Sequence, residues 1–181
     1  AIAITSIRNE LVRMADMAKE NVDLSFRAIL DGNPGYMEQI EKTEDYVDFL
    51  NQEIAKGISK VIVNEANDND SRLISALFKV TGNIERISDH AMNLGGYAKL
   101  LDELHITLSE EARKEVEQMH QVSMTAMDYM SCIENEPESL YMKIEDLEQQ
   151  FDDMTVCFRQ SQIGRLKSQR CSDEACVIYS E

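Results

Sequence analysis

The sequence predicts an all-α protein, an antiparallel bundle of long amphipathic helices. Apolar residues recur at alternating steps of three and four over long stretches, which is typical of helices buried along one seam. Alternating segments rich in Val, Ile and Thr, which are typical of strands, are absent from the sequence. Hydrophobic residues make up 43% of the 181 residues, which is enough for a compact core.

The first half of the chain predicts three helices. The first spans about residues 5–30, and its apolar face consists of Ile7, Leu11, Met14, Ala18, Val22 and Ile29. It ends near Asn33, where two glycines and a proline predict a turn. The second helix continues to about Asn64, with an apolar face of Ile40, Val47, Leu50, Ile54 and Val61. A polar loop around Asn67 then offers the N-cap of a third helix, which reaches about Leu104.

The second half predicts two further helices and the start of another. A short link near Ile106 leads to Ser109, and a serine followed by two glutamates is favoured at a helix start. This fourth helix continues to about Ile133, and Pro137 breaks the pattern. A fifth helix runs from about Ser139 past Phe158, with a seam of Ile144, Leu147, Phe151, Met154 and Phe158.

The fifth helix repeats the second at an offset of 104 residues. At this offset the apolar seams coincide, and the acid pair Glu44/Asp48 falls on Glu148/Asp152. We therefore expect two three-helix repeats, at about 1–104 and about 105–181. The sixth helix would then be truncated at Glu181 and would leave apolar surface uncovered. Either the second repeat is loosely ordered, or a second copy covers this surface in a homodimer.

The third helix carries the cluster of polar residues that calls for a chemical explanation. Its apolar seam consists of Leu73, Leu77, Val80, Ile84, Ile87, Ala91, Leu94, Ala98 and Leu101. Glu85 and Asp89 fall outside this seam and are expected to point away from the core. Two carboxylates at i and i+4 repel each other unless a positive charge lies between them, so a bound cation would explain the pair. Gly82 and Gly96 share this face, which indicates that something approaches it closely, since each glycine costs a helix about 1 kcal/mol.

A solvated acidic face is the simplest alternative to a cation site. The chain has 34 acidic residues, and pairs such as Asp16/Glu20 occur elsewhere. Arg86 could also neutralise one of the two acids. The matching register nevertheless makes Glu44 and Asp48 the expected neighbours of Glu85 and Asp89 in an outward-facing site. Glu148 and Asp152 would belong to its counterpart in the second repeat.

The donor set does not identify the metal, and nothing in the sequence indicates an enzyme. Carboxylate oxygens suit Fe, Mn, Mg, Ca or Zn alike. A ferritin-like di-iron site needs two Glu-x-x-His elements that face inward, and here only Glu117 and His120 have that spacing. A Gly-rich phosphate loop and a nucleophile elbow are both missing. These features favour a binding module over a catalyst.

The net charge of the chain makes some classes of binding partner less favourable than others. The chain carries a net charge of −16, which disfavours nucleic acid and anionic membrane surfaces and favours cations or basic protein surfaces. No apolar run approaches the roughly 18–20 residues that span a bilayer. Four cysteines without zinc-ribbon spacing indicate reduced thiols in a cytosolic setting.

Two segments resemble a known family. The segment I-E-R-I-S-D-H-A-M-N-L at residues 84–94 resembles the E-R-I-G-D-H-A-x-N-I signature of PhoU-like domains, the phosphate-uptake regulators, with Ser88 where that family usually has glycine. The segment T-E-D-Y-V-D-F-L-N-Q-E-I at residues 43–54 resembles the PhoU-like domain at the C-terminus of bacterial sodium/phosphate cotransporters. The resemblance implies a multinuclear metal site on the helix surface that carries Glu85 and Asp89.

The resemblance also implies a partner and a location. Free-standing regulators usually carry Q-Q-P-x-A-x-D-L-R before the third helix, and N-E-A-N-D-N-D-S-R at residues 64–72 departs from it. This departure favours the cotransporter branch, a soluble regulatory domain attached to a membrane transporter at the cytoplasmic face of the inner membrane. The alternatives are a free-standing regulator that acts on another phosphate-signalling protein, and a non-catalytic helical scaffold.

Overall fold

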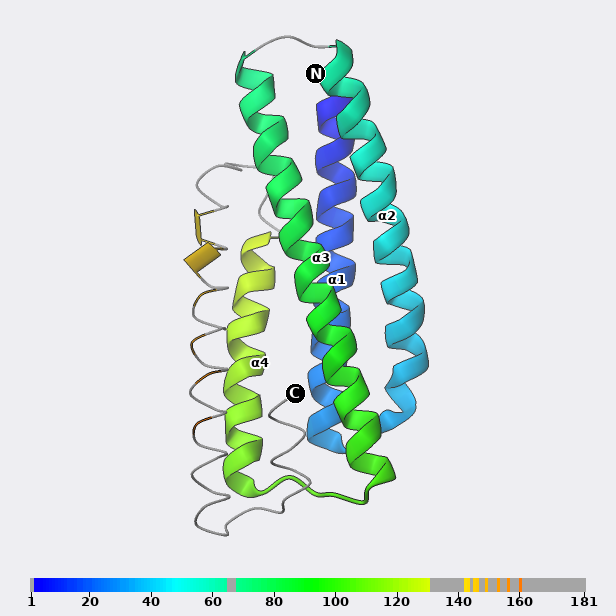
Figure 1. The fold of residues 1–181 in the computed structure, drawn as a ribbon, viewed down its shortest axis with the longest axis vertical. Coiled ribbons are helices and arrows are strands. Elements are labelled where there is room, and N and C mark those ends of the chain that lie inside the picture. Colours follow the sequence, from blue (N-terminus) through cyan, green and yellow to red (C-terminus); the bar gives the residue numbers. More distant parts are fainter. Residues whose placement is uncertain are drawn as a thin grey trace.

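The chain folds into long helices that run antiparallel to one another (Figure 1). The computed structural model describes residues 2–64 and 68–130 and eight separate positions between 142 and 160. Over the two continuous ranges the α-helices are α1 (Ile2–Asp31), α2 (Met37–Asn64), α3 (Asp68–Glu103) and α4 (Glu110–Met130). A 3₁₀ turn, η1 (Pro34–Tyr36), leads from α1 to α2. Since none of the described residues lies in a strand, the all-α prediction is confirmed.

The helix ends follow from local chemistry, as the sequence predicts. Gly32 has a φ of 63°, a left-handed conformation that glycine adopts easily, and its N–H donates to the carbonyl of Ile29 at 3.3 Å. The Asn33 side chain then accepts a hydrogen bond from the N–H of Gly35 at 2.9 Å. At the start of α4, the Ser109 hydroxyl accepts from the N–H of Ala112 at 3.2 Å. Both of these predicted helix boundaries are therefore confirmed.

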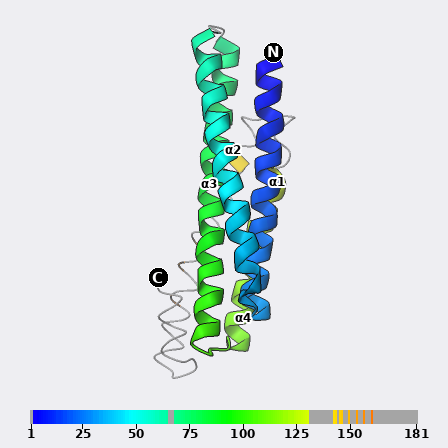
Figure 2. The same ribbon diagram turned by 90° about the vertical axis from the view of Figure 1, so that its right-hand side faces the viewer.

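The predicted seams form the core, and α1 lies at its centre. All the apolar residues predicted for the faces of α1 and α2 are buried. Helix α1 packs against α2, α3 and α4, whereas α2 packs against α1 and α3 (Figure 2). One core cluster joins the first part of α1 to α2 and α3, and it includes Leu11, Ile54 and Leu77. A second cluster lies toward the other end, where Phe26 of α1 and Ala98 of α3 meet Val116 of α4.

Polar contacts as well as apolar packing hold α4 on α1. Lys19 forms an ion pair with Asp128, and the Arg113 Nη1 donates to the carbonyl of Leu30 at 2.6 Å. The His120 Nε2 lies 2.8 Å from the Asp23 Oδ1. The His120 ring also stacks on Phe26, with 4.9 Å between ring centroids.

Helices α2 and α3 approach each other closely at Gly95. A Cβ at this buried position would lie 2.9 Å from the Met37 Sδ and 3.4 Å from the Ile40 Cδ1. The missing side chain therefore lets the first turn of α2 rest directly on α3.

Several predictions concern residues outside the described part of the chain. They are the loop at Asn67, the break at Pro137, the seam of the fifth helix, the truncated sixth helix and the apolar surface it would leave. The boundary between two three-helix repeats likewise stays a prediction. None of the described helices is both long enough and apolar enough to cross a membrane.

Candidate metal centre

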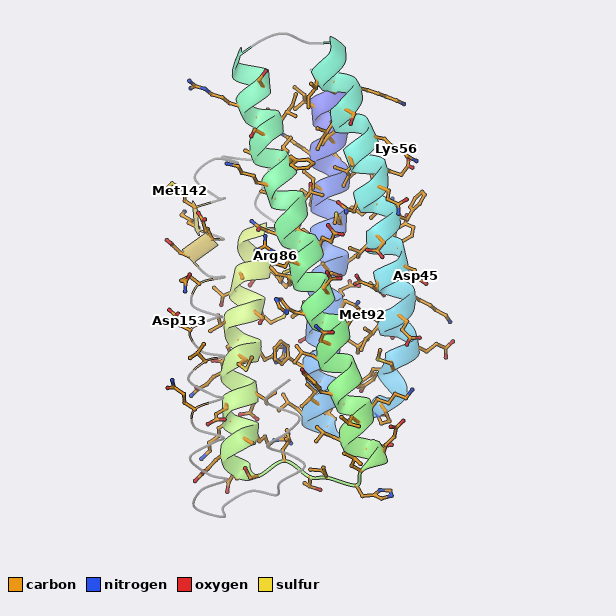
Figure 3. All side chains as sticks on the ribbon, viewed as in Figure 1. Asp45, Lys56, Arg86, Met92, Met142 and Asp153 are labelled. Carbon is orange, nitrogen blue, oxygen red and sulfur yellow. The ribbon has the colours of Figure 1, made fainter. Side chains whose placement is uncertain are left out.

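The antiparallel packing of α2 and α3 brings the acids of both helices to one level of the bundle. The Ser88 hydroxyl of α3 donates a hydrogen bond to the Glu44 Oε2 of α2, so the two helices are directly joined there. Figure 3 marks this level with Asp45 on α2 and with Arg86 and Met92 on α3. The expected neighbourhood of Glu44 and Asp48 with Glu85 and Asp89 follows from this register, because each pair spans one helical turn.

Glu44 is the inner member of this group. Its side chain is buried, with only 8% of the residue exposed, whereas the sequence places it in an outward-facing site. Burial is the largest cause that raises the pKa of Glu44, and the neighbouring Asp48, Asp89 and Glu85 carboxylates raise it further. The hydrogen bond from Ser88 acts in the opposite direction, because it stabilises the charged form. The expectation of an outward orientation is therefore wrong for Glu44, which lies in the seam between α2 and α3.

The other three acids lie nearer to solvent. Glu85 is half-buried, and Asp48 and Asp89 are exposed, in agreement with the predicted outward orientation of the α3 pair. Partial burial, followed by the Asp89 and Asp45 carboxylates, raises the pKa of Asp48. Carboxylates from two helices thus repel one another at this level, and the repulsion would be relieved by a cation or by protonation.

The chemistry of the four side chains fits a hard cation, although their positions do not form a closed cage. All the donors are carboxylate oxygens, which Mg²⁺, Ca²⁺ and Mn²⁺ prefer. Over the described residues, no three His, Cys, Asp or Glu side chains are placed so that they could hold a metal ion. Exposed carboxylates such as Asp48 and Asp89 can change rotamer, whereas Glu44 is fixed by burial and by Ser88.

The remaining predicted ligands cannot be placed. Glu148 and Asp152 lie outside the described residues, so the counterpart site of the second repeat stays a prediction. Gly82 and Gly96 are exposed, and no atom of the described residues would come within 4 Å of a Cβ at either position. The close approach that these glycines indicate is therefore not made within the described part of the chain.

Two polar contacts between helices were not found by reasoning from the sequence. Ser88 stands out there only as a departure from the family signature, yet its side chain is fully buried and bonded to Glu44. Its place on the flank of the apolar seam is the signal that could have found it. The second contact is the pair of His120 and Asp23, which has no signal because the two residues are 97 positions apart.

Glu117 and His120, which have the spacing of a di-iron element, contact different residues. Glu117 pairs with Arg113 at 3.5 Å, whereas His120 contacts Asp23 and Phe26 of α1. Neither contact involves the acids of α2 and α3. The di-iron alternative therefore gains no support from these two residues.

A concave surface lies between α1 and α2, apart from the candidate metal ligands. It is a groove of about 580 Å³ between α1 and α2, with an apolar floor that includes Ile7 and Ile54 and a wall formed by the exposed Phe49. At its edge the Arg13 Nη2 donates to the Tyr46 hydroxyl at 2.8 Å. None of the four candidate metal ligands lines this groove, so it is a separate feature.

Comparison with known proteins agrees with the signature on α3. The family model of the PhoU domain matches residues 11–98, which include the four candidate metal ligands of α2 and α3. The chain is 27% identical over 97 residues to a phosphate-specific transport system accessory protein PhoU homolog of Aquifex aeolicus. That match covers 53% of this chain and 44% of the relative, so it spans less than half of the relative's length. A PhoU homolog of Archaeoglobus fulgidus is 24% identical over 152 residues, which cover 81% of this chain and 77% of that protein.

The same fold occurs in a solved structure. The crystal structure of PhoU from Pseudomonas aeruginosa superposes with a TM-score of 0.79 at 18% sequence identity. The superposition covers 98% of this chain and 85% of that chain. The signature and the four candidate ligands of α2 and α3 therefore lie within the region, residues 11–98, that matches the PhoU domain.

Proposed function

We propose that this chain is a regulatory domain of phosphate uptake, which binds divalent cations and catalyses no reaction. The observation that carries the proposal is the match of residues 11–98 to the PhoU domain. The two relatives with similar sequences are named as accessory proteins of a phosphate-specific transport system. A regulatory role also agrees with the sequence, since it contains no phosphate-binding loop and no nucleophile elbow.

The cation site of the proposal consists of Glu85 and Asp89 of α3 together with Glu44 and Asp48 of α2. Mutual electrostatic effects among these carboxylates support it, because they indicate that negative charge accumulates where α2 meets α3. A divalent cation bound between two helices would stabilise their packing, so its binding or loss can change the surface offered to a partner. Glu148 and Asp152 are proposed to form the counterpart site. The two sites together would hold more than one metal ion.

The partner is either an attached membrane transporter or a separate protein. The segments at residues 43–54 and 64–72 support attachment to a sodium/phosphate cotransporter. The names of the two relatives support the alternative, a free-standing accessory protein. The complete gene distinguishes the two, because membrane-spanning segments encoded upstream of this chain are required by attachment and excluded by the alternative.

The cation site is tested by elemental analysis of protein purified without chelator or nickel resin. Glu85→Gln combined with Asp89→Asn should abolish metal retention, since it removes both candidate ligands of α3 while leaving the helix intact by circular dichroism. Asp16→Asn combined with Glu20→Gln is the matched control, because it removes an acid pair of the same spacing from α1. Unchanged metal content in the α3 double variant contradicts the site assignment.

The regulatory role is tested in cells. The gene is replaced by the same two double variants, and the uptake of radiolabelled phosphate is measured at low and high external phosphate. We expect the α3 variant, like a deletion, to lose the dependence of uptake on external phosphate, and we expect the α1 control to retain it. A deletion strain whose uptake responds normally to phosphate contradicts the proposed function.

A further inference from the structure

The line of contact between α1 and α2 has one side covered by α3 and another side that carries the groove. Helix α3 packs against both α1 and α2, and α4 packs against α1 on the side away from α2 (Figure 1). All the residues that line the groove of about 580 Å³ belong to α1 and α2. A furrow between two packed helices accepts a third helix, whose side chains enter the space between theirs.

Apolar and aromatic side chains line this groove and are held in place at one end. The Phe49 side chain is 52% exposed, and its ring lies 5.9 Å from the Tyr46 ring. The Arg13 Nη2 donates to the Tyr46 hydroxyl at 2.8 Å, and the guanidinium lies 5.4 Å from the centre of that ring. Aromatic residues and Arg are enriched in binding hot spots, and side chains that are fixed beforehand lose little entropy on binding.

The charged residues of the groove follow an order along its length. Arg13 of α1 meets Tyr46 of α2 at one end, and because the helices are antiparallel Lys60 lies toward the other end. Glu10 is about one turn along α1 from Arg13, and Glu53 is about two turns along α2 from Tyr46. The two acids therefore lie in the middle of the groove, on opposite walls.

This charge order favours a basic occupant over a second copy of the chain. Glu53 forms an ion pair with Lys56 at 2.9 Å, whereas Glu10 makes no hydrogen bond or ion pair with the described residues. A second copy related by a two-fold axis through the middle of the groove would bring the same two acids against Glu10 and Glu53. Each copy would also carry a net charge of −16.

We propose that the groove between α1 and α2 binds a helix of a partner protein, with large apolar residues on one face and Lys or Arg on both flanks of its middle. The lining residues of α2 extend from Tyr46 to Val61, which is about 22 Å at about 1.5 Å per residue, so the bound helix has about four turns. Its apolar residues recur at steps of three and four and contact the floor at Ile7 and Ile54. The inference goes beyond the proposed function and does not use the cation site, so each can fail alone.

The occupant is identified by cross-linking of the full chain in its native cells. Phe49→p-benzoylphenylalanine places a photoreactive group at the groove, and the cross-linked peptide is sequenced by mass spectrometry. We expect one recurring peptide of another protein, with apolar residues at helical spacing and Lys or Arg near its middle. Phe78→p-benzoylphenylalanine is the matched control, because Phe78 is 59% exposed but lies on α3, outside the groove, and it should not yield this peptide. A peptide of this chain, a peptide without that pattern, or no cross-link specific to position 49 overturns the proposal.

A blocking variant shows whether the cross-link is made in the groove. Gly57 lines the groove, and a Cβ there would lie 3.5 Å from the Ile7 Cγ1, an ordinary van der Waals contact. Gly57→Leu should therefore fold, with an unchanged or higher melting temperature because a helical glycine is replaced, and should reduce the cross-link at position 49 at least tenfold. Gly96→Leu is the matched control on α3 and should retain it. An undiminished cross-link in the folded Gly57→Leu variant overturns the proposal.

The charge complementarity is tested with a synthetic peptide of the cross-linked sequence, whose Kd is measured by fluorescence polarisation. Glu10→Lys should raise this Kd about 2- to 30-fold, because it replaces one attraction by one repulsion. A peptide with Glu in place of its central basic residues should prefer the Glu10→Lys chain. Glu20→Lys changes the net charge equally outside the groove and should leave the Kd unchanged. Equal Kd values for Glu10→Lys and Glu20→Lys contradict the proposed basic partner, whereas a deletion strain that responds normally to phosphate contradicts only the proposed function.

Discussion

Two adjacent glycines of α3 allow a sharp test of the contact between α2 and α3. Gly95 is buried, and a Cβ there would lie 2.9 Å from the Met37 Sδ and 3.4 Å from the Ile40 Cδ1. Gly96 is exposed, and no atom of the described residues would lie within 4 Å of its Cβ. An alanine at either position gains the same helix propensity, but only the alanine at 95 must displace the ends of the Met37 and Ile40 side chains.

The expected magnitudes follow from this geometry. Gly96→Ala should raise the free energy of unfolding by about 1 kcal/mol, because it removes glycine from an exposed helix interior. Gly95→Ala gains a similar amount but overpacks the interface, which costs about 1–3 kcal/mol, so the net change should lie between zero and about 2 kcal/mol of destabilisation. The melting temperatures of the two variants should therefore differ by about 2–12 °C for a domain of this size.

Urea unfolding followed by circular dichroism measures both variants under one condition. Met37→Ala provides a further control, because removal of the Met37 sulfur should restore most of the gain from Gly95→Ala. Equal stabilisation by Gly95→Ala and Gly96→Ala would refute the reasoning. It would mean that the Met37 and Ile40 side chains do not crowd the position of a Cβ at residue 95.

Two other predictions concern the buried acid and the α4 contact. Burial and the neighbouring carboxylates raise the pKa of Glu44, so its protonated form stabilises the fold at low pH and this contribution is lost as the pH rises through the folded-state pKa. Glu44→Gln, which stays neutral, should have a higher free energy of unfolding than wild type at neutral pH. Urea titrations at lower pH should show that this difference disappears on acidification. A difference that grows toward acid would contradict the raised pKa of Glu44. Phe26→Ala should lower the free energy of unfolding by about 3–5 kcal/mol, since it leaves a cavity at a buried site and removes the stack with His120. Hydrogen exchange in this variant should be faster in α4 than in α2. A loss below about 1 kcal/mol would show that Phe26 does not hold α4 on α1.

The architecture was predictable because its causes are local. The steps of three and four along α1 and α2 identify one apolar face, and each predicted residue of those faces is buried. The turn at Gly32 and the cap at Ser109 likewise depend on a few adjacent residues. Such features need no knowledge of which helix packs against which, so periodicity and capping chemistry suffice.

The inner part of the candidate site was not predictable in the same way. Whether Glu44 faces solvent or α3 depends on the register at which α3 packs against that flank of α2, and the spacing of residues along one helix does not determine that register. The role of Ser88 depends on the same register, since its hydroxyl has an acceptor on α2 only when the helices are aligned in this way. The sequence indicated that the two acid pairs are neighbours. Which of the four acids are buried and which are exposed depends on how α2 and α3 pack against each other.

The polar contacts of α4 with α1 join residues that lie farther apart along the chain than the hydrogen bonds between α1 and α2 and between α2 and α3 do. Hydrogen bonds between α1 and α2 and between α2 and α3 join residues 19, 33 and 44 positions apart, whereas the polar contacts of α4 with α1 join residues 83, 97 and 109 positions apart. A larger loop costs more entropy to close, and contacts between distant residues slow folding. During synthesis α1, α2 and α3 also emerge before α4. We therefore expect α2 and α3, which carry the four candidate ligands, to assemble with α1 before α4 docks.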